Sequence, residues 1–122
     1  MNTALLNLLV IRAVDVHRLA DFYSALGLRF EQHRHGRGAE HYAAQLGDSV
    51  FEIYPKQPES EATSGVRLGF AVPCLEEAVE RLREKSAQVL VEPYDSPWGR
   101  RAVVRDIEGH TVEICERQPG SA

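Results

Sequence analysis

The sequence predicts an α+β fold of two tandem βαβββ modules, whose curved mixed sheets surround a concave groove. Three observations predict it: strand-like and helix-like segments alternate in a fixed order, that order returns after about 60 residues, and a polar stretch separates the two copies. With 122 residues, the chain is long enough for one ordinary domain with a buried core. We expect one domain over residues 1–116 and a flexible tail over 117–122.

The first module, about residues 1–56, begins with the apolar strand Leu5–Ile11. Asp15 is placed to cap a helix in which apolar residues recur at helical spacing from Val16 onward. Gly27 is placed to end this helix. Three short strands then complete the module, at residues 29–31, 41–46 and 49–54.

The second module, about residues 65–116, repeats this order after a polar linker at 57–64. A strand over 67–72 ends at Pro73, and a helix follows over 75–82. Ser86 and Ala87 end this helix less well than a glycine would. Strands at 88–91, 101–105 and 111–115 complete the module.

Two carboxylates stand at equivalent points of the two modules, although strands rarely carry Glu. Glu52 and Glu113 lie in the middle of the last strand of each module, and Asn7 and Arg67 occupy equivalent points of the first strands. Strand alternation places all four on one concave face. Because two carboxylates on one face repel each other, we expect Arg67 to lie between Glu52 and Glu113 in an ion-pair network.

Three stretches carry a resemblance to a known family: "DFYSALGLRF" (21–30), "FEIYP" (51–55) and "PWGRRAVVRDIEGHTVEI" (97–114). They resemble the vicinal oxygen chelate superfamily, which includes glyoxalase I, bleomycin resistance proteins, fosfomycin resistance enzymes and extradiol dioxygenases. The resemblance spans essentially the whole chain, including the duplicated order of elements. It implies a homodimer with a groove at a subunit or module interface, and it leaves open whether modules pair within one chain or between two.

The resemblance also implies four metal-ligand positions, which here carry Asn7, Glu52, Arg67 and Glu113. Both carboxylates remain, but neither imidazole does, and Arg67 brings a permanent positive charge to the site. If the first strand slips by one residue, Leu8 replaces Asn7. We therefore expect no tightly bound metal, with Glu52 and Glu113 as the residual ligand positions.

A groove with two carboxylates and one Arg keeps a slight negative excess, which suits a cationic or hydrogen-bonding ligand. Trp98 lies in a loop bounded by prolines, where it either packs on its own loop or stacks with Tyr94 on a planar ligand. Tyr54 is in phase with Glu52. The expected ligand-binding residues are Asn7, Glu52, Tyr54, Arg67, Tyr94, Trp98 and Glu113.

The histidines fall outside this set. His17, His33, His35 and His41 are expected to be mostly solvated, and His110 belongs to a turn and is expected to be structural. His33 and His35 would reach the groove only if the loop at 33–39 folds inward.

Composition excludes several partners. A net charge of −4 and a pI near 5.7 disfavour nucleic acid, and the short basic clusters, Arg34 with Arg37 and Arg100 with Arg101, are expected in solvated loops. The first apolar run is too short to cross a membrane. Cys74 and Cys115 show no paired spacing, as expected in a reducing cytoplasm.

These observations favour a small-molecule-binding protein similar to bleomycin resistance proteins, without a tightly bound metal. The alternative is a lyase or transferase resembling glyoxalase I. There Glu52 and Glu113 would bind a divalent Zn, Ni, Mn or Fe ion, and Glu113 would also act as the catalytic base. A third possibility is a scaffold that keeps the fold for dimerisation.

Overall fold

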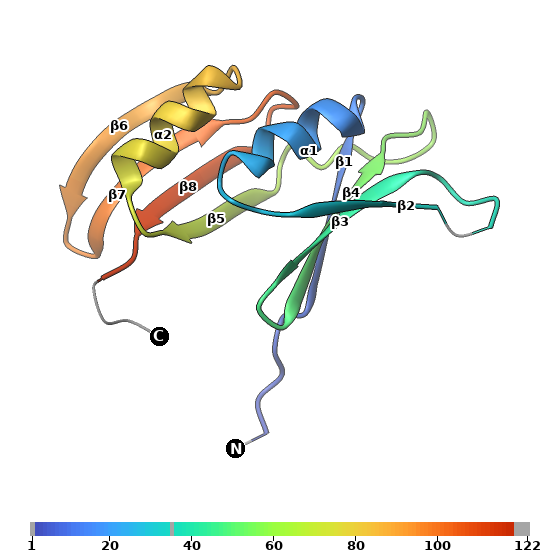
Figure 1. The fold of residues 1–122 in the computed structure, drawn as a ribbon, viewed down its shortest axis with the longest axis horizontal. Helices are drawn as coiled ribbons and strands as arrows, with labels where there is room; N and C mark the ends of the chain where they lie inside the picture. Colours follow the sequence, from blue (N-terminus) through green and yellow to red (C-terminus); the bar gives the residue numbers. More distant parts are fainter. Residues whose placement is uncertain (1, 35, 119–122) are drawn as a thin grey trace.

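The computed structural model describes residues 2–34 and 36–118 and contains two modules of the same plan (Figure 1). The first module comprises β1 (Leu8–Ala13), α1 (Val16–Ser24), β2 (Phe30–His33), β3 (His41–Leu46) and β4 (Ser49–Pro55). The second comprises β5 (Arg67–Val72), α2 (Leu75–Glu84), β6 (Gln88–Ser96), β7 (Gly99–Arg105) and β8 (Thr111–Glu116). The predicted βαβββ order is confirmed in both halves.

Each module folds into one curved, open sheet of four strands (Figure 1). Sheet A has the order β1-β4-β3-β2, and sheet B has the order β5-β8-β7-β6. The first and last strands of each module pair in parallel, and the other pairs are antiparallel. The sheets are therefore mixed, as the sequence predicted, and each helix serves as part of the crossover that parallel pairing requires.

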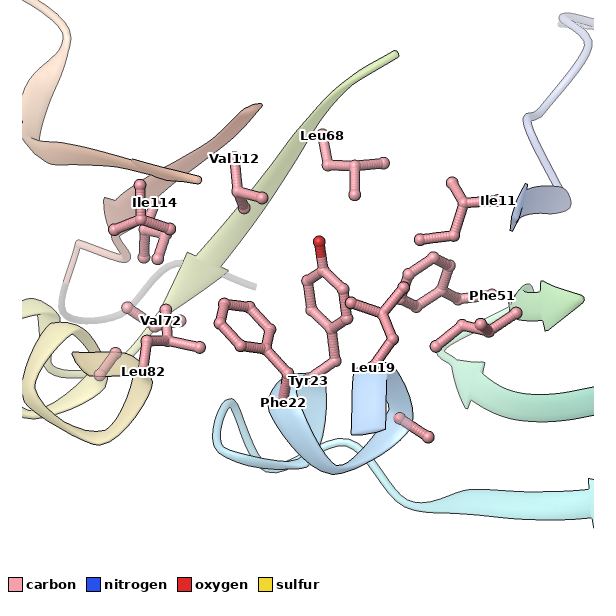
Figure 2. Close-up of a cluster of buried hydrophobic side chains, with 14 of the residues drawn as sticks. Ile11, Leu19, Phe22, Tyr23, Phe51, Leu68, Val72, Leu82, Val112 and Ile114 are labelled. Carbon is pink, nitrogen blue, oxygen red and sulfur yellow. The ribbon is translucent and has the colours of Figure 1, made fainter. Parts of the chain in front are cut away.

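The two sheets share one apolar core, into which α1 inserts its side chains. Figure 2 shows Phe22 and Tyr23 of α1 extending between residues of sheet B, such as Leu68, and residues of sheet A, such as Phe51. Phe22 and Tyr23 are almost fully buried. Because one cluster holds side chains of both modules, packing fixes the two sheets relative to each other.

The turn before β8 joins the modules through buried polar contacts. The Tyr23 hydroxyl donates to Asp106 Oδ2 at 2.6 Å, and the backbone amides of Glu108 and His110 donate to Asp106 Oδ1. His110 Nδ1 lies 2.9 Å from Asp106 Oδ2, and its Nε2 lies 2.7 Å from the Thr63 hydroxyl in the linker. His110 is 1% exposed, so its predicted structural place agrees with the fold.

Glu108 from the same turn binds the start of α1. Its carboxylate accepts hydrogen bonds from the amides of Val14 and Asp15, both at 3.0 Å. The Asp15 side chain caps the helix by accepting from the Arg18 amide at 3.0 Å, as predicted. A carboxylate beside the first turn is also favoured by the helix dipole.

Several segment boundaries differ from the sequence prediction, most of all in β1 and β6. β1 begins at Leu8 rather than Leu5, and β6 continues to Ser96 rather than ending at Val91. Residues 119–122 of the predicted tail lie outside the described residues, while the Arg117 amide donates to the carbonyl of Val72 at 2.7 Å. Neither helix of the described ranges is long and apolar enough to cross a membrane.

Candidate functional site

The outward face of sheet A, the face that does not carry α1, is hollowed into a cavity of about 710 Å³. Alternation along β4 turns Phe51 and Ile53 into the core and leaves Glu52 and Tyr54 on the outward face. β2 and β3 contribute further polar side chains. Polar residues that line the cavity are Arg29, Glu31, His33, His41, Gln45 and Glu52.

Three rings stack in a row on this face. The His41 ring lies between those of His33 and Tyr54, with centroids 5.8 and 4.1 Å away and interplanar angles of 22° and 8°. The Arg12 guanidinium lies 5.3 Å from the centroid of the Tyr54 ring. Such stacked and cationic contacts hold planar groups at fixed positions.

His41 also links the row of rings to the carboxylate. Its Nδ1 lies 3.2 Å from the carbonyl oxygen of Ala39, and its Nε2 lies 3.6 Å from Glu52 Oε2. A carbonyl oxygen only accepts, so the contact with Ala39 requires the proton on Nδ1. His41 is 2% exposed, so the prediction that it is solvated is wrong. His33 lines the cavity from β2 itself, and His35 lies outside the described residues.

The outward face of sheet B carries the second carboxylate. Glu113 on β8 accepts from Arg67 Nη2 on β5 at 3.0 Å, and Arg101 on β7 forms a second ion pair with the same oxygen. Tyr94 on β6 is the register partner of Arg101 and shares its face. Glu113 is therefore held by guanidinium groups from both neighbouring strands.

The predicted bridge from Arg67 to both carboxylates does not form within one chain. Arg67 pairs with Glu113, whereas Glu52 pairs with His41 on the other sheet. The Arg67 side chain is 56% exposed, so its ion pair contributes about 1 kcal/mol or less.

Asn7 does not occupy the position that the repeat predicted. In sheet A, Val10 is the register partner of Glu52, and in sheet B, Gly69 is the register partner of Glu113. Leu8 lies two residues before Val10 in β1, and Arg67 lies two residues before Gly69 in β5. Leu8 is therefore the equivalent of Arg67. Asn7 precedes β1 and borders a different hollow, together with Thr3, Leu5, Leu6, Asp48 and Ser49.

The loop predicted around Trp98 is a β-hairpin. Tyr94 lies in β6, and Trp98 lies in the turn to β7, where it is 84% exposed. It therefore does not pack on its own loop. Arg100 is also a strand residue, so its predicted place in a solvated loop is wrong, whereas Arg101 lies in the strand predicted over 101–105.

Sequence reasoning missed Arg101 and His41. Both occupy the same alternation phase as outward residues on their strands, and this phase is visible in "RRAVVR" and "HYAAQL". The alternation phase does not show which strands are neighbours in the sheet. That pairing decides that Arg101 meets Glu113 and that His41 meets Glu52 and Tyr54.

The residues do not fit the divalent metal that the resemblance implies. The four equivalent positions carry Leu8, Glu52, Arg67 and Glu113, and two guanidinium groups already bind Glu113. A dication there would be repelled by both permanent charges. One other cluster of potential ligand atoms occurs in the described ranges, at Cys74, Glu76 and Glu116, but its carboxylates bind Arg100 and the Leu75 amide.

Comparison with known protein families places this chain in one of them. The model of the Glyoxalase/Bleomycin resistance protein/Dioxygenase superfamily matches residues 5–114. The phenazine antibiotic resistance protein EhpR of Enterobacter agglomerans is 31% identical over 78 residues, which cover 57% of this chain and 60% of EhpR.

Two solved structures show the same fold over nearly the whole chain. TnmS3, an antibiotic binding protein from Streptomyces sp. CB03234, aligns with a TM-score of 0.75 and 20% identity, covering 97% of this chain and 99% of TnmS3. A glyoxalase-related enzyme from Fulvimarina pelagi aligns with a TM-score of 0.75 and 20% identity, covering 94% of this chain and 89% of the enzyme.

Proposed function

Because the chain belongs to the glyoxalase/bleomycin resistance protein/dioxygenase superfamily, we propose that it binds a small planar molecule of the antibiotic type, without a tightly bound metal. The observation that carries this proposal is the row of stacked rings on sheet A, of which His33 and His41 line the cavity and Tyr54 packs behind His41. The similarity to EhpR, named for phenazine antibiotic resistance, supports an aromatic ligand. A planar ring system would lie in the cavity against the wall that His33 and His41 form, while Glu52 accepts a hydrogen bond from the ligand.

We further propose that the binding groove forms between two copies in a homodimer. The cavity beside Glu52 is lined by residues of the first module alone and is open to solvent on one side. A second copy of the chain could cover this open side. Exposed apolar side chains favour a covering partner: Leu6 is 77% exposed and Leu8 is 49% exposed. They border an apolar hollow of about 410 Å³ between the first strands of the two sheets.

In this arrangement, sheet A of one copy faces sheet B of the other across the ligand. Glu52, His41 and Tyr54 come from one side, and Glu113, Arg67, Arg101 and Tyr94 come from the other. We place the protein in the cytoplasm, where its two free cysteines remain reduced.

The metal part of the proposal is tested by thermal unfolding of the purified protein with Ni, Zn, Mn or Fe(II). We expect sub-stoichiometric metal and little stabilisation, because guanidinium groups occupy the residual ligand Glu113. A stoichiometric metal bound more tightly than about micromolar would stabilise the fold by mass action and would favour the glyoxalase-like alternative.

The ligand part is tested by calorimetric titration with phenazine, phenazine-1-carboxylate and phenazine-1-carboxamide. We expect saturable binding of at least one probe by a dimer, and about two- to tenfold weaker binding by Tyr54→Ala, which removes the ring that stacks on His41 in the cavity wall. Val14→Ala, at an exposed residue of the turn before α1, is the matched control. Binding that is equal in Tyr54→Ala and Val14→Ala, or a monomer at tens of micromolar, contradicts the proposed groove.

A further inference from the structure

Building on the proposed function, we propose that the natural ligand carries an acidic group, such as a carboxylate, and that Arg101 together with Arg67 binds it on sheet B. The outward face of this sheet has an excess of positive charge, one donor without a hydrogen bond in the described part of the chain, and open space beside Glu113.

The outward face of sheet B carries an excess of positive charge. Glu113 is the one carboxylate on this face in the described parts of β5, β7 and β8, and it is shared by Arg67 and Arg101. One carboxylate neutralises only one of these two guanidinium groups. The groove wall therefore favours an anion, which reverses the negative excess that the sequence predicted.

Sheet A carries two cavity-lining carboxylates, Glu31 and Glu52, with the imidazoles of His33 and His41 at 3.4 and 3.6 Å from them. These carboxylates repel an anion on the sheet A side of the groove. Arg29 also lines the cavity. Across the groove, an anionic group would thus find its cationic partners on sheet B.

Arg101 offers a donor that the described part of the chain does not use. Its Nε is buried and makes no hydrogen bond there, while its Nη2 pairs with Glu113. The side chain is only 20% exposed, and a buried donor without an acceptor is costly. A guanidinium offers five N–H groups in a planar fork, so it can bind Glu113 and a second carboxylate at once.

The strand beside Glu113 leaves room for such a group. Gly69 on β5 is the register partner of Glu113 and is exposed. A Cβ added to Gly69 would meet no atom within 4 Å. Tyr94 on β6 lies next to Arg101 on β7, on the side of Arg101 away from β8. A ligand acid can therefore approach the two guanidinium groups from above Gly69, with its ring system directed toward the stacked rings of the partner's sheet A.

The test compares phenazine-1-carboxylate with its neutral isostere phenazine-1-carboxamide at pH 7. We expect the carboxylate to bind about tenfold tighter, because it gains charge-assisted hydrogen bonds. In Arg101→Gln this preference should fall to about twofold or less. Arg101→Lys keeps the charge but lacks Nε and the planar fork, so it should recover only part of the preference. Arg67→Gln changes an exposed side chain that the fold tolerates and should also reduce the preference.

Arg100→Gln is the matched control, because it removes the same charge from the neighbouring residue, which pairs with Glu76 and Asp95 instead of Glu113. It should keep the full preference for the carboxylate. Equal binding of both probes by the parent, or a preference that survives in Arg101→Gln, overturns the inference while leaving the proposed function intact.

An NMR measurement tests the acid site on sheet B separately from the proposed ring site on sheet A. The side-chain Nε–Hε NMR signal of Arg101, assigned by its loss in Arg101→Gln, should shift on addition of phenazine-1-carboxylate or millimolar benzoate. If benzoate shifts it and no phenazine binds, the acid site stands and the proposed ring site fails. If neither acid shifts it, the inference is wrong.

Discussion

At the scale of single residues, Asp106 shows how the fold keeps a charge inside. Its carboxylate is 4% exposed, and burial alone raises the pKa of such a group. Hydrogen bonds from His110 and Tyr23 outweigh this effect and hold the pKa of Asp106 below its ordinary value. Burial and the neighbouring carboxylate raise the pKa of Tyr23, so its hydroxyl stays a donor.

Asp106→Asn is therefore expected to destabilise the protein in a pH-dependent way. Because the folded pKa of Asp106 is depressed, its stabilisation is present above the unfolded pKa of about 3.9 and is lost as pH falls through the lower folded pKa. We expect a loss of about 3 kcal/mol in the free energy of unfolding at pH 7, and a smaller loss in acid. Urea unfolding between pH 7 and 2 measures both.

Asp48→Asn serves as the control, because it changes an exposed carboxylate in the turn between β3 and β4. It should leave the stability within about 0.5 kcal/mol of the parent at every pH. If Asp106→Asn keeps the same deficit at pH 2 as at pH 7, the charge of Asp106 is not what joins the modules.

The sequence repeat allowed two site residues to be predicted, but it did not identify the other residues of the site. Glu52 and Glu113 were found because a carboxylate in the middle of a strand is unusual and recurs at one offset. Asn7 was misplaced, since leucines at 5, 6, 8 and 9 fill both strand phases and leave the register undetermined. Arg101 depends on long-range strand pairing, which the periodicity of one sequence does not contain.

At the scale of elements, local signals predicted the helices well and the long hairpin poorly. The cap at Asp15 and the left-handed Gly27, with φ +91°, frame α1 as expected. The β6–β7 hairpin was mistaken for a loop because Pro93 and Pro97 interrupt it. Pro93 is tolerated there because β6 is an edge strand and its register with β7 shifts between Val91 and Tyr94.

The end of α2 supplies a prediction at this scale. Ser86 has a φ of +74°, a left-handed conformation that costs an L-residue about 1–2 kcal/mol. Ser86→Gly should therefore raise the free energy of unfolding by about 1 kcal/mol, after part of the gain is offset by the greater freedom of glycine in the unfolded chain.

Ser86→Ala keeps the Cβ and the strain, so it should show no such gain in the same urea titration. Ser86 is exposed, so neither substitution disturbs the core. Equal stability of Ser86→Gly and Ser86→Ala would show that this conformation carries no cost in the folded protein.

At the scale of the whole molecule, the shared core decides where a ligand can bind. Packing between α1 and both sheets fixes the modules, while the outward faces, with Glu52 on one sheet and Glu113 on the other, have separate partners. The proposed dimer joins these faces from two copies, so that rings from one side and guanidinium groups from the other enclose one ligand. Each dimer then has two such grooves.

Subunit mixing tests this central claim most directly. Ala43→Trp fills the sheet A face at the register partner of Glu52, and Gly69→Trp fills the sheet B face at the register partner of Glu113. Each variant alone should lose phenazine-1-carboxylate binding, because both grooves of its dimer are blocked. After the two variants are unfolded together and refolded at equal concentrations, calorimetry should find about one quarter of the grooves active, since each mixed dimer has one groove without either Trp. No recovery of binding would show that the site lies within one chain and would contradict the account.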